Sequence, residues 1–429
     1  MGKPKIRFRG YTDDWEQRKL LSCIQSITDF RGRTPKKLGM DWSESGYLAL
    51  SALNVKDGYI DFSQDVHYGN QELYDKWMSG KELHRGQVLF TTEAPMGNVA
   101  QVPDNKGYIL SQRTIAFDVE EEILSENFLA TLLRTPNVFN DLTALSSGGT
   151  AKGVSQKSLS GLDVVIPKNI DEQNKLADYF INLDHLITLH QRKCEETKKL
   201  KKYMLQKMFP RNGQVVPEIR FSGFTDDWEQ RKVGDLVKDG IIDAPLDGNH
   251  GEKHPTASEY VDLGIPFLMA SDVHNGIVNI KSCKFITSER AKRLDKGFTK
   301  NGDVLLTHKA TIGESAILQG LETEYAVLTP QVTYYRIQDE ERLSREYLYA
   351  FFNSVKFQND LRTKAMQSTR PYIGISAQQD LDIVLPRKLM EQKKIGVYFF
   401  NLDHLITLHQ NKCDELKKIK KFMLQNMFV

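Results

Sequence analysis

Cysteine is scarce in this 429-residue sequence, which contains four cysteines. They stand singly, and none belongs to a C-x-x-C pair. The sequence therefore indicates neither a disulfide framework nor a zinc site built from thiolates. Cys194 and Cys413 occupy matching positions of a repeat described below, where we expect small buried side chains rather than redox groups.

Long apolar runs are missing as well. No stretch approaches the roughly 18 uninterrupted apolar residues of a membrane helix, and the N-terminal sequence MGKPKIRFRG lacks the apolar core of a signal peptide. We therefore expect a cytoplasmic protein with no membrane partner. Charge of one sign does not dominate either, because the formal net charge is +2. That balance excludes a uniformly basic protein but permits local basic surfaces.

Motifs that bind nucleotides are also absent from the sequence. It has no G-x-x-x-x-G-K-[ST] phosphate loop and no glycine-rich fingerprint after a strand. The sequence HGEKH at 250–254 sets two histidines four residues apart. Gly251 and Pro255 oppose a helix there, and the glutamate is not where zinc peptidases carry it. We expect no cofactor, no metal ion and no catalytic residue in this chain.

What the sequence does contain is a tandem duplication. Residues 179–209, YFINLDHLITLHQRKCEETKKLKKYMLQKMF, recur as residues 398–428 with 24 identities in 31 positions. Residues 4–19, PKIRFRGYTDDWEQRK, recur as residues 217–232 with 13 identities in 16 positions. Weaker matches lie between them, such as GQVLFTTEAPMGNVA and GDVLLTHKATIGESA. The duplication therefore extends along the whole chain.

Both copies of the longer repeat predict helices, because they contain neither proline nor glycine and are rich in good helix formers. Steps of four and three join Leu183, Ile187 and Cys194 in an apolar row, as in a heptad seam. A second row beside it, with Leu186 and Leu200, would let the helix bury a wider stripe. A core helix of an ordinary bundle would show the same pattern, but two near-identical copies favour packing of each helix against its twin.

The order of elements predicts the architecture. Each half reads as a short N-terminal motif, a globular segment with β-type runs, a strand that ends in Ile-Pro or Leu-Pro, and the long helix. The first helix ends just before the second globular segment, so the second helix must run back if the two pack together. The sequence thus predicts an α+β fold: two mixed α/β domains related by pseudo-two-fold symmetry and separated by an antiparallel coiled coil of two long helices.

The expected boundaries are residues 1–168 for the N-terminal motif and first domain, 169–209 for the first helix, 210–217 for a linker, 218–387 for the second domain and 388–429 for the second helix. The expected strands include QVLF and LDVVIP, at 87–90 and 162–167, and the expected shorter helices lie within 125–141 and 344–360. The Asp-Asp pairs at 13–14 and 226–227, each followed by Trp, predict a helix N-terminus with a docked aromatic anchor.

Lysines and arginines gather in loops that take corresponding places in both halves. Such loops are suited to phosphate contacts and base-edge readout, although each residue alone fits a solvated loop equally well. The residues that we expect to contact DNA are Arg31, Arg33, Lys36, Lys37, Lys152, Lys157, Lys309, Lys364, Arg370 and Tyr372. The first long helix is basic too, with seven Lys or Arg against two Glu in residues 192–207. That helix could contact nucleic acid or an acidic partner protein.

The repeated TDDWEQRK, the passages IPKNIDEQNK and LPRKLMEQKK, and the NLDHLITLHQ helices closely resemble the specificity subunit of type I restriction-modification systems, over essentially the full length. The resemblance implies two target-recognition domains that each read one half of a bipartite site in double-stranded DNA, with the helix pair as spacer. It also implies a non-catalytic chain that binds two adenine methyltransferase subunits and motor-nuclease subunits. The variable segments differ, so we expect an asymmetric site.

Under this resemblance, the residues that would dock partners or close the helix pair are Trp15, Trp228, Leu183, Ile187, Leu402 and Ile406. A competing hypothesis is a duplicated coiled-coil adaptor with two protein-binding domains and no DNA specificity. The near-zero net charge and the acidic TDDWE motifs favour it. A self-sufficient methyltransferase or nuclease is disfavoured by the missing cofactor and metal motifs.

Overall fold

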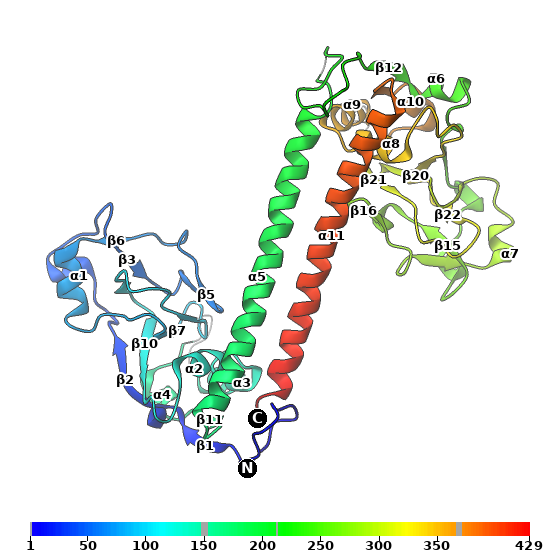
Figure 1. The fold of residues 1–429 in the computed structure, drawn as a ribbon. Helices are drawn as coiled ribbons and strands as arrows, with labels where there is room; N and C mark the ends of the chain where they lie inside the picture. The colour runs from blue at the N-terminus through cyan, green and yellow to red at the C-terminus, as the bar shows by residue number, and fades with distance from the viewer. Residues whose placement is uncertain (1, 147–152, 212, 366–370) are drawn as a thin grey trace. The chain divides into compact units, whose positions relative to one another are not determined.

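The computed structural model describes residues 2–146, 153–211, 213–365 and 371–429 (Figure 1). The chain forms two compact units. Unit 1 extends to His190 and resumes from Asn411 to Val429, and unit 2 comprises Gln191–Gln410. Each unit therefore holds one globular domain together with parts of both long helices. These helices are α5 (Ile170–Lys207) and α11 (Leu389–Asn426).

The globular domain of unit 1 is built on a sheet of four antiparallel strands. Their order is β2 (Ile24–Asp29), β10 (Thr114–Val119), β7 (Val88–Thr91) and β8 (Val99–Gln101). A smaller sheet has the order β6 (Tyr68–Gly69), β3 (Tyr47–Leu50) and β9 (Ile109–Leu110), and β4 (Val55–Lys56) pairs with β5 (Tyr59–Ile60). The shorter helices are α1 (Gln71–Met78), α2 (Glu126–Leu132), α3 (Pro136–Leu145) and α4 (Gln156–Leu159).

Unit 2 repeats this plan with a larger peripheral sheet. Its four-stranded sheet has the order β13 (Leu246–Asp247), β23 (Val332–Tyr335), β20 (Val304–Lys309) and β21 (Thr311–Ile317). Its second sheet has the order β14 (Tyr260–Val261), β18 (Lys284–Ile286), β15 (Ile265–Leu268), β22 (Ala326–Leu328) and β19 (Phe298–Thr299), and β16 (Val273–His274) pairs with β17 (Ile277–Val278). The shorter helices are α6 (Val233–Lys238), α7 (Ser288–Ala291), α8 (Arg345–Phe352), α9 (Val355–Ala365) and α10 (Ile375–Gln379).

The N-terminal motif of each half closes its domain by pairing with the strand that leads into the long helix. In unit 1, β1 (Glu16–Lys19) pairs antiparallel with β11 (Asp163–Ile166). In unit 2, β12 (Glu229–Lys232) pairs with β24 (Asp382–Leu385) in the same register. The expectation of a helix N-terminus at the Asp-Asp pairs is therefore wrong, because the residues after each tryptophan find their backbone partners across a sheet.

The aromatic anchor expected beside those aspartates is present. Trp15 is 1% exposed and makes edge-to-face contacts with Phe128 and Phe428, at centroid distances of 6.5 and 6.2 Å. Trp228 packs in the same manner on Phe209, at 6.2 Å. The tryptophan of each motif thus packs its domain against the C-terminal end of one long helix, since Phe428 follows α11 and Phe209 follows α5.

Within each unit the two long helices run antiparallel. In unit 1, Phe180 on α5 contacts Phe428 just beyond α11, with centroids 5.7 Å apart. In unit 2, Phe399 on α11 contacts Phe209 just beyond α5, also at 5.7 Å. A cap fixes the start of α5, where Asn169 Oδ1 accepts hydrogen bonds from the backbone of residues 171 and 172. The predicted pair of long antiparallel helices and the predicted mixed α/β domains are confirmed.

The predicted apolar seam is buried. Leu183, Ile187 and Leu402 are each less than 9% exposed and Ile406 is half-buried, while the thiol of Cys194 lies 3.8 Å from the Ile406 carbonyl. All four cysteines are free and buried. The second apolar row is only partly buried within the units: Leu186, Leu200, Leu405 and Leu408 are exposed, whereas Leu189 and Ile419 are half-buried. Among the described residues, no helix is long and apolar enough to cross a membrane.

Candidate nucleic-acid interface

The four-stranded sheets of the two units share one register, which gives equivalent positions in domains whose sequences differ. In unit 1, Phe90 pairs with Ile115, which pairs with Asp29. In unit 2, Leu306 pairs with Thr333, which pairs with Asp247. Phe90 and Leu306 are matching residues of the repeat. Asp29 and Asp247 therefore occupy the same position, each as the last residue of its sheet-edge strand.

A turn beside this position brings distant loops together in both units. The strand is followed in each case by an alanine with positive φ, Ala94 at 47° and Ala310 at 70°, a conformation that is rare outside glycine. A later segment returns to this turn. Glu93 forms a bridge with Gly153, and Lys309 forms the matching bridge with Tyr372.

Matching backbone hydrogen bonds hold the returning segments. Val154 donates to the carbonyl of Thr92 at 2.9 Å, and Ile373 donates to that of His308 at 3.2 Å. In each domain a later segment thus meets the turn of Ala94 or Ala310 at one place. We call these places the first cluster, which contains Asp29, and the second cluster, which contains Asp247.

In the first cluster, Asp29 holds the loop that follows it. Its carboxylate accepts hydrogen bonds from the Arg31 backbone at 2.9 Å and from the Gln156 side chain at 3.3 Å. The Arg31 guanidinium lies 3.4 Å from the same carboxylate and is half exposed. Arg33 stacks its guanidinium 4.3 Å from the centre of the Phe30 ring, and Lys37 donates to the Gly32 carbonyl at 2.7 Å. These bonds orient the basic loop without covering its charges.

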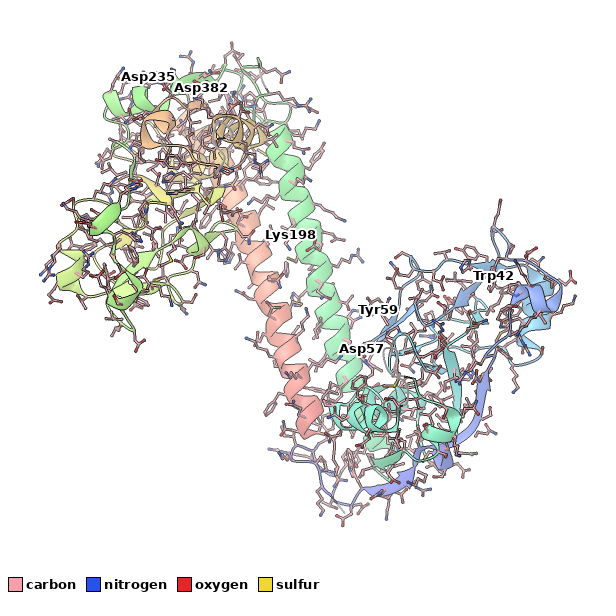
Figure 2. The ribbon with its side chains drawn as sticks, turned by 180° about the vertical axis from the view of Figure 1, so that it is seen from behind. Trp42, Asp57, Tyr59, Lys198, Asp235 and Asp382 are labelled. Atoms are coloured by element: carbon pink, nitrogen blue, oxygen red, sulfur yellow. The ribbon has the colours of Figure 1, made fainter. Side chains whose placement is uncertain are left out.

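A cavity of about 460 Å³ opens beside the first cluster. Arg33, Lys36 and Gln112 contribute to its lining. So does Trp42, which Figure 2 labels and which stacks on His67 with a centroid distance of 5.4 Å. Cationic, amide and aromatic groups thus face one hollow, and the cationic and amide groups are suited to the edges of nucleobases.

The second cluster is built around a more deeply buried carboxylate. Asp247 is 1% exposed, yet its carboxylate accepts hydrogen bonds from Lys296 Nζ at 2.5 Å and His250 Nε2 at 2.8 Å. Burial acts to raise the pKa of Asp247, but the hydrogen bonds from Lys296 and His250 outweigh it and lower the pKa below its ordinary value. The carboxylate is therefore ionised at neutral pH.

His308 supports the second cluster from inside the domain. Its ring is fully buried, with Nδ1 3.0 Å from the carbonyl of Ile373 and Nε2 4.0 Å from Asp247. Burial lowers the pKa of His308 to about 4, although the carboxylate of Asp247 opposes the shift. The next residue, Lys309, places its ammonium 5.8 Å from the centre of the Tyr372 ring at the surface. Lys309 and Tyr372, both expected from the sequence, thus lie together.

The other expected DNA contacts lie at different distances from the clusters. Lys36 is exposed beside the cavity, and Lys157 is exposed on α4 next to Gln156. Lys364 lies on α9, where it donates to the Asp380 carbonyl at 2.7 Å. Lys152 and Arg370 fall outside the described residues. DNA contact by all of these residues stays a prediction.

Sequence reasoning missed Asp29, Asp247, His250 and Lys296 as members of a site. Lys296 is 49 residues from Asp247, and nothing in the local sequence connects the two. A weak signal existed at Asp247, because it is followed by Gly-Asn in a turn-like context. No signal marked Asp29.

The six residues expected to dock partners or close the helix pair are buried, apart from the half-buried Ile406. Trp15 and Trp228 are buried, so each holds its own domain to a helix end, and a direct contact with another protein stays a prediction. Each half also has a buried ion pair: Arg7 pairs with Glu172 at 2.7 Å, and Arg220 pairs with Glu391 at 2.6 Å. Exposed apolar side chains on the helices include Leu186, Leu200, Leu405 and Leu408 of the second row.

Comparison with known proteins identifies the family. The family model for the type I restriction modification DNA specificity domain matches residues 12–199 and again residues 225–418. The chain is 22% identical to the type I restriction enzyme MjaVIII specificity subunit of Methanocaldococcus jannaschii, over 95% of this chain and 91% of that protein. The putative type I restriction enzyme MjaX specificity subunit of the same organism is 21% identical with the same coverage.

Among solved structures, the type I restriction-modification S subunit from M. genitalium matches with a TM-score of 0.67. The match covers 100% of this chain and 99% of that one at 14% identity, so it supports the fold. The two family matches correspond to the two halves of the duplication. The chain therefore belongs to the type I restriction-modification specificity subunits and carries two specificity domains.

Proposed function

We propose that this chain reads an asymmetric bipartite DNA site, with one half-site contacted by each globular domain. The observation that carries the proposal is the pair of clusters on an identical sheet register with different side chains. Asp29 holds Arg31 and Gln156 in the first cluster, whereas Asp247 holds Lys296 and His250 in the second. Different donors at equivalent places favour different bases, because each base pair presents its own donor and acceptor pattern in the major groove.

The long helices serve in this proposal as the spacer between the half-sites. A helix of 38 residues spans about 57 Å at 1.5 Å per residue. That length exceeds one turn of B-DNA, which is about 34 Å. Insertion or deletion of a heptad in both α5 and α11 would accordingly change the number of unread base pairs and leave both half-sites unchanged.

The chain directs catalysis by partners rather than carrying it out. Two methyltransferase subunits, and motor-nuclease subunits for restriction, are the partners that the family suggests. The exposed second row of the helices supports such docking, because Leu186 and its repeat equivalent Leu405 are each 41% exposed and recur in both halves. Duplicated apolar surface on one chain suits two copies of one partner.

Methylome sequencing tests the proposal. Deletion of the gene should remove adenine methylation from one bipartite, non-palindromic motif. Replacement of residues 20–165 by the corresponding segment of another member should then change one half-site only. A methylome without a lost motif would contradict DNA targeting, and a change in both half-sites would contradict independent domains.

Salt dependence separates DNA recognition from a protein adaptor. A complex that neutralises several phosphates releases counterions, so its affinity for DNA must fall steeply between about 50 and 200 mM salt. Binding of a protein partner through the apolar row should change little over this range. Absence of any DNA binding by the assembled complex at low salt would favour the adaptor.

A further inference from the structure

We propose that Asp29 and Asp247 are equivalent positioning residues, one for each half-site, and that Lys296 and His250 contact DNA in the second half-site. The inference rests on the proposed function and deepens it. It assigns the Asp247 cluster as a binding site for duplex DNA phosphates and base edges. The cation held by each aspartate makes the contact, and the aspartate sets where that cation lies.

The first support for this inference is the shared register of the two four-stranded sheets. Asp29 and Asp247 end equivalent edge strands, although the residues that follow them, Phe-Arg-Gly-Arg and Gly-Asn-His-Gly, match at no position. In both domains the following loop meets the carboxylate: Asp29 accepts from the backbone N–H of Arg31 and lies 3.4 Å from its guanidinium, and Asp247 accepts from the ring of His250. In both the carboxylate also accepts from a residue that is distant in sequence, 127 positions away for Gln156 and 49 for Lys296. Two domains with different loops have kept one arrangement.

The exposure of the partners is the second support. Asp247 is 2% exposed in its side chain, whereas Lys296 is 34% exposed and His250 is 51% exposed. A carboxylate taken out of water needs compensation, and internal partners alone would supply it in a purely structural cluster. Here the compensating groups reach outward. An ammonium has three N–H donors, and Lys296 uses one on Asp247, so further donors can meet an acceptor from solvent.

Neighbouring charge is the third support. Lys309 and Tyr372 lie at the same strand end, and the loop of Ile373 hydrogen-bonds to His308 behind Asp247. Lys309 thus brings a second ammonium to this end of the sheet, beside the pair of Lys296 and Asp247. A flexible lysine held by a buried anion loses little further freedom when it binds a phosphate, which is the advantage of an organised contact.

The test uses the assembled methyltransferase complex and its methylome-defined site. Binding is measured on three duplexes: the full site, a site with the first half scrambled, and a site with the second half scrambled. Asp247→Asn should weaken binding to the full site about tenfold, comparable with the loss of one good contact, and leave binding to the duplex with a scrambled second half unchanged. Asp29→Asn should likewise weaken binding to the full site but leave binding to the duplex with a scrambled first half unchanged.

Two further variants keep the test independent of folding. Lys296→Gln and His250→Gln change partly exposed side chains, and Lys296→Gln should lower the slope of log affinity against log salt by about one. In the Asp247→Asn background, Lys296→Gln should cause little further loss of DNA affinity, since both substitutions remove the same contact. The matched controls are Asp163→Asn and Asp382→Asn, which change equivalent aspartates on β11 and β24. Asp382 is labelled in Figure 2. Both controls should leave DNA binding unchanged.

The inference is overturned if Asp247→Asn weakens all three duplexes by one factor, or if the losses from Asp247→Asn and Lys296→Gln are additive. It is also overturned if the Lys296→Gln complex keeps the wild-type affinity and salt slope. These results differ from failure of the proposed function. In that case the wild-type complex itself would bind full and scrambled duplexes equally.

Discussion

Lys201 on α5 and Asp403 on α11 form an ion pair of 2.5 Å in unit 2, and their repeat equivalents Lys420 and Asp184 form one of 2.5 Å in unit 1. Each aspartate also bonds to its own globular domain. Tyr349 donates to Asp403 at 2.7 Å, and Arg134 donates to Asp184 at 2.9 Å. One carboxylate per unit therefore joins both helices and the domain.

Loss of this carboxylate charge should destabilise unit 2. Asp403→Asn leaves the ammonium of Lys201 without its counterion at a site where both side chains are less than 16% exposed. We expect the free energy of unfolding to fall by about 1–3 kcal/mol, measured by urea denaturation with the fluorescence of Trp228, the one tryptophan in the sequence of unit 2. Glu195→Gln, which breaks an exposed pair with Lys198, should cost less than about 0.5 kcal/mol. Equal losses of stability from Asp403→Asn and Glu195→Gln would contradict the idea that burial strengthens the ion pair of Lys201 and Asp403.

Gly396 should tolerate no side chain, although it lies inside helix α11. A Cβ at this position would lie 2.5 Å from backbone atoms of Glu346 and Tyr347. Ala usually stabilises a helix by about 1 kcal/mol over Gly. Here we expect Gly396→Ala to lower the free energy of unfolding by about 2 kcal/mol, because α8 cannot approach as closely.

The duplication provides the matched control for Gly396. The repeat equivalent in unit 1 is Ala177, which is fully buried. Ala177→Gly should cost about 1 kcal/mol, chiefly through helix propensity. If thermal or urea unfolding showed Gly396→Ala to be stabilising, the close approach of α8 and α11 would be refuted.

The helix-end aromatics should contribute strongly to stability. Phe428 is 5% exposed and packs on Trp15 and Phe180, so Phe428→Ala should cost about 3–4 kcal/mol in unit 1. Phe422, on α11, is 55% exposed, and Phe422→Ala should cost less than about 1 kcal/mol in the isolated chain. Calorimetry of both variants checks the contrast, and similar losses would argue against the packing at Trp15.

Unit 2 should lose stability in mild acid because of His308. Burial lowers the pKa of this histidine from 6.5 to about 4 in the folded state. Above pH 6.5 both states hold it neutral and the protein keeps its full stability. Between pH 6.5 and 4 the unfolded chain gains a proton that the folded one does not. The free energy of unfolding should therefore fall by on the order of 3 kcal/mol over this range.

His308→Gln should flatten that part of the pH profile, as measured by the urea midpoint of the Trp228 signal between pH 7 and 4. The control is His404→Gln, because His404 is exposed on α11. A profile for His308→Gln as steep as that of the wild type would assign the acid sensitivity to other groups. Carboxylates such as Asp247 would be the next candidates, because its lowered pKa makes it lose its stabilising charge in more acid solution.

Much of the architecture was readable from the sequence because its causes are local or repetitive. Heptad spacing predicted the buried faces of α5 and α11, and the Leu183 and Leu402 positions are buried as expected. The expected strands at 87–90 and 162–167 appear as β7 and β11. The motif EQRK misled, since these residues form helices readily, yet they are strands in both copies because β11 and β24 supply backbone partners.

The sequence by itself determined the duplication, the two long helices and the family, since a repeat of residue types is visible without knowing which side chains meet. The clusters were decided by tertiary structure alone. Asp29 meets Gln156 because a later segment returns to the turn at Ala94, and Asp247 meets Lys296 because Asn249 donates to the Lys296 carbonyl at 2.7 Å. A single carboxylate in a variable loop carries no periodic signal. Its role depends on the cation that long-range packing places beside it.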